Sequence, residues 1–132
     1  MKPKVLDAYA LMAFYENEPG ADTVRELILS AEKGTNELSM TAINLGEVWY
    51  SLARNYSSKV ADHYVHEVEA MAIEIVPADW SLAYQAAQFK AGGHLSYADC
   101  FAAALAKLKN AELVTGDKEF KSLQDQIKVH WI

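Results

Sequence analysis

A helix pattern and then a strand pattern occupy residues 95–117, which read LSYADCFAAALAKLKNAELVTGD. Phe101, Leu105 and Leu108 recur at helical spacing after Ser96, a residue type that favours the position just before a helix. The short apolar run at residues 112–115 then favours a strand. A helix that leads directly into a short buried strand is typical of α/β folds with a parallel sheet.

The same alternation continues through the rest of the chain. Apolar stripes at helical spacing predict five more helices, over residues 8–15, 24–31, 45–52, 60–71 and 82–89. Short segments with strand character lie among them, at residues 5–6, 37–40, 73–76 and 128–132. The sequence therefore predicts a helix-rich α/β fold, a three-layer α/β/α sandwich with a short central parallel sheet, in one domain over residues 1–132.

Composition and charge narrow the classes of function. The 132 residues are 52% apolar and 23% charged, which is typical of one globular domain. The net charge of −6 provides no basic surface to attract a polyanion, which at first argues against a nucleic-acid partner. Cys100 is the single cysteine, so an internal disulfide and a multi-cysteine zinc site are excluded.

The apolar content predicts no membrane association. The longest apolar run, residues 100–106, has seven residues, whereas a membrane-spanning helix needs about 20. The first residues lack the long apolar stretch of a secretory leader. We therefore expect a cytoplasmic protein.

Four acidic residues fall where a parallel sheet presents its binding site. Asp7 and Asp117 follow two of the predicted strands, and Glu47 and Asp99 lie in the first turns of two predicted helices. Ligands of open parallel sheets bind at the carboxyl ends of the strands, where these helices also begin. Carboxylates that converge there repel one another unless a cation binds among them, and their oxygens suit Mg²⁺ or Mn²⁺. Such an arrangement favours metal-assisted hydrolysis of a phosphate ester.

Each acid taken alone also has a structural explanation. Asp99 lies three residues after Ser96 and can interact with the helix dipole, and Asp117 can cap a short last helix over residues 118–123. Glu47 lies at the edge of an apolar stripe, from which its carboxylate can reach solvent. Asp7 is harder to explain in this way, because it directly follows an apolar strand. The metal-site hypothesis therefore depends on the four acids together.

Four segments of the chain resemble the PIN-domain ribonucleases, and in particular the small VapC toxins of prokaryotic toxin–antitoxin pairs. They are VLDAYAL at residues 5–11, NLGEV at 44–48, LSYADCFAAALA at 95–106 and LVTGDKEF at 113–120. The resemblance covers essentially the whole chain and implies a PIN-like fold. It also implies an endoribonuclease that hydrolyses RNA by a metal-activated water, with Mg²⁺ or Mn²⁺ as cofactor. Besides RNA, it implies two partners, a cognate antitoxin and a second copy of the chain in a homodimer.

The resemblance assigns roles to the same four acids. Asp7 and Asp99 would be the principal metal ligands, and Asp117 would complete the site directly or through a water. Glu47 would bind a second metal or orient the attacking water. Thr115 matches a hydroxyl position that supports the metal site in the family.

Three further residues are candidates for supporting roles. Ser96 would cap the helix that carries Asp99. Asn44, one turn before Glu47, is either a support or phosphate contact or an ordinary residue of the first helical turn. Lys90 is either a phosphate contact or an ordinary solvated lysine near a helix end.

The chain departs from the family pattern at two places. Ala8 and Tyr9 stand where many relatives have Ser, Thr or Asn, so a supporting hydroxyl is missing next to the first aspartate. Glu119 stands where relatives often have a further aspartate, and its longer side chain leaves its role open.

Two other functions remain as alternatives. One is a catalytically weak PIN module that acts as a binding or scaffold protein, which the Ala8 and Tyr9 departures favour slightly. The other is a phosphoryl-transfer domain with Asp7 as nucleophile. A phosphoryl-transfer domain needs a second acid near Asp7 or at the end of the third strand. The first strand has Asp7 alone, which disfavours this hypothesis.

Overall fold

Five short strands alternate with helices along the chain, as the sequence predicts. The computed structural model describes residues 2–132. In chain order its elements are β1 (Lys4–Leu6), α1 (Ala8–Tyr15), α2 (Ala21–Glu32), β2 (Leu38–Thr41), α3 (Ala42–Asn55), α4 (Ser58–Glu69), β3 (Glu74–Val76), α5 (Trp80–Ala91), α6 (Tyr97–Leu108), β4 (Glu112–Thr115), the 3-10 helix η1 (Lys118–Leu123) and β5 (Lys128–Trp131). Each predicted helix and strand is present, with ends that differ by a few residues.

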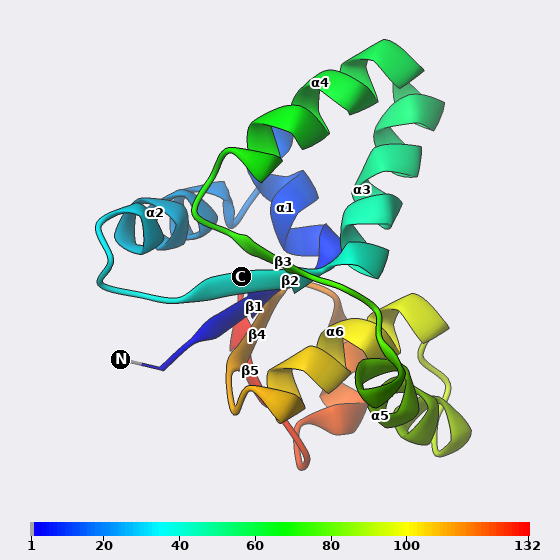
Figure 1. Cartoon of the computed structure of the whole chain (residues 1–132). Helices are drawn as coiled ribbons and strands as arrows, with labels where there is room; N and C mark the ends of the chain where they lie inside the picture. Colours follow the sequence, from blue (N-terminus) through cyan, green and yellow to red (C-terminus); the bar gives the residue numbers. More distant parts are fainter. Residues whose placement is uncertain (1) are drawn as a thin grey trace.

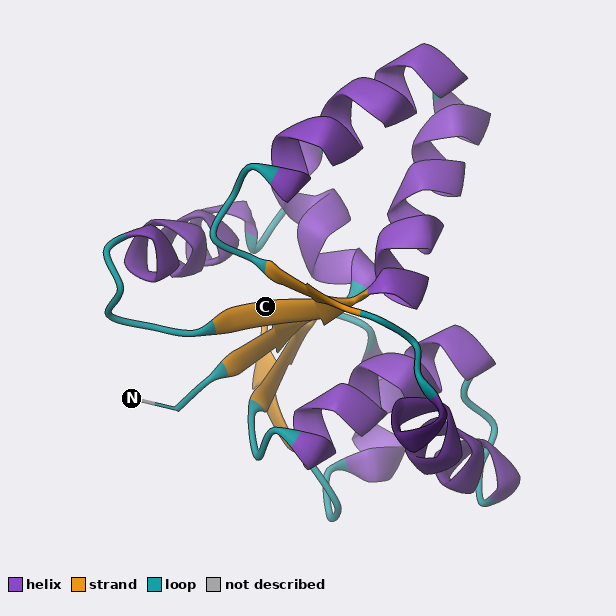
Figure 2. Cartoon of the chain, in the orientation of Figure 1, coloured by secondary structure: helices purple, strands orange, loops and turns teal. Residues whose placement is uncertain are grey.

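The five strands form one parallel sheet in the order β3-β2-β1-β4-β5 (Figure 2). The chain builds outward from β1 through β2 to β3, and then returns to the other side of β1 for β4 and β5. In the central pair, Val5 lies opposite Leu113 and Leu6 opposite Val114. The strand order therefore reverses direction between β1 and β4, which makes this pair the topological switch point of the sheet. Ligands of open α/β sheets bind in the crevice at such a point.

Helices cover both faces of the sheet (Figure 1). The first four helices lie on one face, and α5 and α6 lie on the other. Neighbouring residues of a strand point to opposite faces. Accordingly, Leu6 and Val114 pack into the core under α1 to α4, whereas Val5 and Leu113 pack against α5, α6 and η1. The predicted three-layer α/β/α sandwich is therefore confirmed.

Helix α6 is buried along most of its length. Residues 100–106 are all buried, because α6 packs against α3, α5 and the three strands β1, β2 and β4. Four of these seven residues are alanines, whose small side chains let the neighbouring elements approach closely. This packing holds the first turn of α6, and Asp99 within it, in a defined place.

The helices are short. The longest, α3, has 14 residues. No helix within residues 2–132 has both the length and the apolar character needed to cross a lipid bilayer.

Candidate metal centre

Three carboxylates meet beyond the carboxyl end of the sheet. Asp99 lies in the first turn of α6, Asp117 caps η1, and Glu119 lies in the first turn of η1. One carboxylate oxygen from each lies within 4.8 Å of the other two. The two helix starts are held by caps, because the Asp99 N–H donates to Ser96 Oγ over 3.2 Å and the Glu119 N–H to Asp117 Oδ1 over 3.0 Å. Asp99, Asp117 and Glu119 are called the acid cluster below.

Asp7 lies beside the acid cluster in a buried position. It directly follows β1, is only 2% exposed, and accepts the Ala10 N–H over 2.8 Å. Burial raises the pKa of Asp7 to about 7, and the negative charges of Asp99 and Asp117 add to this shift. Hydrogen bonds from Thr115 and Ala10 oppose it. Asp7 therefore shares the electrostatic environment of the acid cluster.

Thr115 connects Asp7 to Asp117. Its side chain is fully buried at the end of β4, next to β1 in the sheet. The hydroxyl accepts the Asp117 N–H over 3.0 Å, and its effect on the Asp7 carboxylate lowers the pKa of Asp7. Ala8, next to Asp7, carries no hydroxyl. The hydroxyl that acts on the Asp7 carboxylate therefore comes from Thr115, on the neighbouring strand β4.

Tyr9 packs its ring against the backbone of Gly116. Its side chain is 47% exposed, and its ring lies so close that a Cβ on Gly116 would be 2.3 Å from Tyr9 Cε1. A side chain at position 116 would clash with the ring, so the glycine allows Tyr9 to lie against the backbone just before Asp117.

Asn44 holds Glu47 in the same region. Asn44 is fully buried and donates from Nδ2 to Glu47 Oε1 over 2.9 Å and to the Ala98 carbonyl over 3.1 Å. Its Oδ1 accepts from the Thr41 hydroxyl over 2.5 Å. These bonds join the first turns of α3 and α6, and they favour a supporting role for Asn44 over a phosphate contact. Burial raises the pKa of Glu47, and the bond from Asn44 opposes that shift.

Asn44→Ala is expected to lower the free energy of unfolding by about 2 kcal/mol, because the buried Thr41 hydroxyl and the half-buried Ala98 carbonyl lose a partner. Urea denaturation measures the loss. Asn36→Ala is the matched control, since Asn36 is also buried but neither polar atom of its side-chain amide has a partner. Equal losses in the two variants would contradict the role assigned to Asn44.

Within residues 2–132, no basic side chain neutralises these acids. The ion pairs of the structure use Asp22, Glu67, Glu74 and Glu112, all outside the site. Burial, followed by the negative charges of Asp117 and Glu47, raises the pKa of Asp99 to about 6. The surroundings of Asp99 therefore disfavour its charged form, even though it lies at the start of a helix.

Asp99→Asn is expected to stabilise the metal-free chain by about 1 kcal/mol, because burial of the charge and repulsion from the neighbouring carboxylates together outweigh the attraction of the helix start. Thermal denaturation in the presence of EDTA measures the difference. A variant that is less stable than the wild type in EDTA would show that the negative charge of Asp99 does not destabilise the metal-free chain.

The donor set fits a hard divalent cation. The cluster consists of carboxylates alone, with no histidine or cysteine among its three members. Carboxylate oxygens suit Mg²⁺ and Mn²⁺, whereas zinc favours His and Cys ligands. The three carboxylates repel one another and have no cationic partner among the described residues, so a divalent ion bound among them would be stabilising. The acid cluster, with Asp7 next to it, can therefore hold such an ion.

The acid cluster differs in membership from the four acids predicted from the sequence. Asp99 and Asp117 lie within it, together with Glu119, whose role the sequence leaves open. Asp7 and Glu47 lie near it, where their charges and those of Asp99 and Asp117 act on one another. The signal for Glu119 is its place two residues after Asp117, since the first turn of η1 brings the two side chains together.

Ser96 and Lys90 shape the segment that precedes Asp99. Ser96 is the N-cap of α6, as the sequence predicts. Lys90 Nζ donates to the Leu95 carbonyl over 2.8 Å, so its ammonium fixes the loop between α5 and α6.

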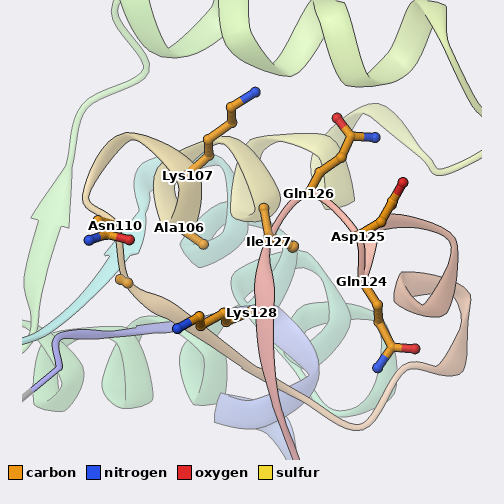
Figure 3. Close-up of a pocket in the computed structure, with 9 residues that line it drawn as sticks. Ala106, Lys107, Asn110, Gln124, Asp125, Gln126, Ile127 and Lys128 are labelled. Atoms are coloured by element: carbon orange, nitrogen blue, oxygen red, sulfur yellow. The ribbon is translucent and has the colours of Figure 1, made fainter.

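A separate pocket of about 360 Å³ lies near the start of β4 and β5 (Figure 3). Its lining includes Asn110 and Ala111, just before β4, and Lys128, the first residue of β5. The amino ends of parallel strands lie at the edge of the sheet opposite their carboxyl ends. This pocket is therefore remote from the acid cluster.

Comparison with known proteins gives a family match and several structural relatives. The PIN domain family model matches residues 4–126. DNA-bound VapBC from Salmonella typhimurium is 17% identical over 98% of both chains, with a TM-score of 0.76. VapBC2 from Rickettsia felis, solved with a promoter fragment, is 18% identical over 98% of both chains, with a TM-score of 0.74.

A third relative is VapC20 from Mycobacterium tuberculosis, a sarcin-ricin loop cleaving toxin. It is 16% identical over 90% of this chain and 93% of the relative, with a TM-score of 0.71. At these identities the likeness concerns the fold alone. No curated protein matches the chain in sequence.

Proposed function

Because the chain belongs to the PIN domain family, we propose that it is an endoribonuclease that depends on Mg²⁺ or Mn²⁺ and serves as the toxin of a toxin–antitoxin pair. The observation that carries the proposal is the acid cluster, whose three carboxylate oxygens lie within 4.8 Å of one another without a basic partner among the described residues. The acid cluster lies at the carboxyl end of the sheet, next to the switch point between β1 and β4.

The residues divide the work of RNA hydrolysis among them. Asp99, Asp117 and Glu119 would hold the ion, with Asp7 as a further ligand from β1. When bound, the ion would lower the pKa of a water and offset the charge that grows on the phosphodiester. Thr115 holds the backbone of Asp117 through its hydrogen bond with the Asp117 N–H, and it lowers the pKa of Asp7.

Glu47 would act on the attacking water. Its Oε1 accepts from Asn44 and is thereby fixed. The other oxygen, Oε2, remains to orient the water and to accept its proton. Burial raises the pKa of Glu47, which makes its carboxylate a better proton acceptor than a solvated glutamate.

The proposed partners are RNA, a cognate antitoxin and a second copy of the chain. The structural relatives include a toxin–antitoxin complex from Klebsiella pneumoniae, which supports an antitoxin. Exposed aromatic residues provide contact area, since Trp80 and Tyr84 on α5 are 74% and 54% exposed with ring centroids 5.7 Å apart. An antitoxin that places an arginine or lysine among the carboxylates would block the ion. We expect the protein to act in the cytoplasm.

The function is tested by incubating the purified chain with single-stranded RNA of mixed sequence in the presence of Mg²⁺. We expect internal cleavage, visible as discrete shorter products on a denaturing gel. Asp7 is unsuited to act as a covalent nucleophile, because it is 2% exposed and its Oδ1 accepts the Ala10 N–H. Intact RNA after incubation, together with saturable RNA binding, would favour the scaffold alternative and overturn the nuclease.

A further inference from the structure

A second pocket borders the acid cluster. It has a volume of about 330 Å³ and forms where the loop between α5 and α6 meets η1. Its lining residues are Gly92, Gly93, His94, Leu95, Glu119 and Ser122. Glu119 is also a member of the acid cluster, so a group bound in this pocket would lie directly beside the proposed metal ion.

The lining of this pocket excludes a phosphate as its occupant. None of its lining residues is a lysine or arginine, and the Glu119 carboxylate would repel an anion. Leu95 is buried and apolar, and the two glycines present no side chains. A volume of this size is at the lower end of that of small-ligand sites, so the pocket suits a small, neutral group.

The polar groups of the pocket are arranged to meet the edge of such a group. Ser122 Oγ donates to the Glu119 carbonyl over 3.0 Å, which leaves its lone pairs free to accept a hydrogen bond. His94 is exposed at the pocket and offers an imidazole ring for stacking. Apolar contact on the faces and hydrogen bonds at the edges are the features by which proteins hold unpaired bases of RNA.

The pocket is formed in advance of binding. The Lys90 ammonium holds the Leu95 carbonyl over 2.8 Å, and the Gly93 N–H donates to the Lys90 carbonyl over 3.4 Å. The loop then continues into Ser96, the N-cap of α6. The position of the pocket relative to Asp99 is therefore fixed by the same segment.

We infer that this pocket receives an unpaired nucleobase of the RNA, next to the phosphodiester that is cleaved. The inference rests on the proposed function and adds a subsite that selects the nucleotide at the cleavage position. It also supplies affinity for RNA that an acidic chain cannot obtain from a basic surface.

Nuclear magnetic resonance of the metal-free full-length chain tests binding without reference to cleavage. The probes are the four ribonucleoside monophosphates and, as a control, ribose 5-phosphate. We expect at least one nucleotide to shift the amide signals of Gly92, Gly93 and Leu95, and ribose 5-phosphate to leave them unchanged. Equal shifts with ribose 5-phosphate would identify a sugar-phosphate site, and the absence of shifts with all four nucleotides would mean no base site. Either result would overturn the inference.

Gly93→Leu tests the same pocket during catalysis. Gly93 does not have a positive φ, and a Cβ there would meet only the Phe89 carbonyl at 3.6 Å, so the variant is expected to fold. We expect KM for RNA to rise about ten-fold, with kcat and Mg²⁺ binding close to those of the wild type. Gln124→Leu, in the pocket near the start of β4 and β5, is the control and should change neither constant.

The outcomes separate this inference from the proposed function. An unchanged KM in Gly93→Leu would overturn the base pocket and leave the nuclease intact. A wild type that cleaves no RNA would overturn the nuclease, and the nucleotide titration would still decide whether the pocket binds a base.

Discussion

Asp99→Asn is expected to lower the rate of RNA cleavage by about 10³-fold or more while the fold stays intact. Asp99 supplies one of the three clustered carboxylate oxygens. The amide that replaces it has the same shape but no negative charge, so the ion is held weakly or in the wrong place. A bound ion contributes several kcal/mol to stabilising the transition state, and each 1.36 kcal/mol corresponds to a factor of about ten in rate. Initial rates on a short RNA measure the loss.

Asp125→Asn is the matched control for this prediction. It makes the same chemical change at an exposed acid that lines the pocket near the start of β4 and β5. Its cleavage rate should equal that of the wild type, and circular dichroism should show folded protein for both variants. Near wild-type cleavage by a folded Asp99→Asn would contradict the role of the acid cluster.

Removal of divalent metal is expected to have an equally large effect. In excess EDTA the carboxylates of the acid cluster have no counter-ion among the described residues, and RNA cleavage should fall to background. Added Mg²⁺ or Mn²⁺ in excess of the chelator should restore it. The core consists of apolar contacts on both faces of the sheet, so the chain should remain folded throughout. Cleavage that continues unchanged in EDTA would contradict a metal-dependent mechanism.

The fold was predictable from local patterns because each element carries its own signals. The stripe of Phe101, Leu105 and Leu108 marks α6, and Ser96 caps it by accepting the Asp99 N–H. The run before Thr115 marks β4, which pairs with β1 as a parallel neighbour. Such signals depend on residues close together in sequence, and they are therefore readable without the structure.

The candidate site was predictable only in part, because its final geometry depends on contacts between distant segments. Asp99 and Asp117 follow from their places after strands and at helix starts. Glu119 is near Asp117 in sequence, but its approach to Asp99 depends on η1 beginning next to α6, which no local pattern indicates. The effect of Thr115 on the pKa of Asp7 likewise depends on the pairing of β4 with β1.

The net charge of −6 has a different meaning once the acids are located. Five acids lie in or near one site. A divalent ion bound there, rather than a basic surface, would neutralise their charge and allow a phosphate to approach. The base pocket adds contacts that do not depend on charge. An acidic chain is therefore compatible with RNA as substrate.

The most direct test of the metal centre is a calorimetric titration of Mg²⁺ into the metal-free chain. We expect saturable binding to the wild type and to Asp125→Asn, and no saturable binding to Asp99→Asn. Absence of saturable binding to the wild type, or equal binding to Asp99→Asn, would contradict the metal centre.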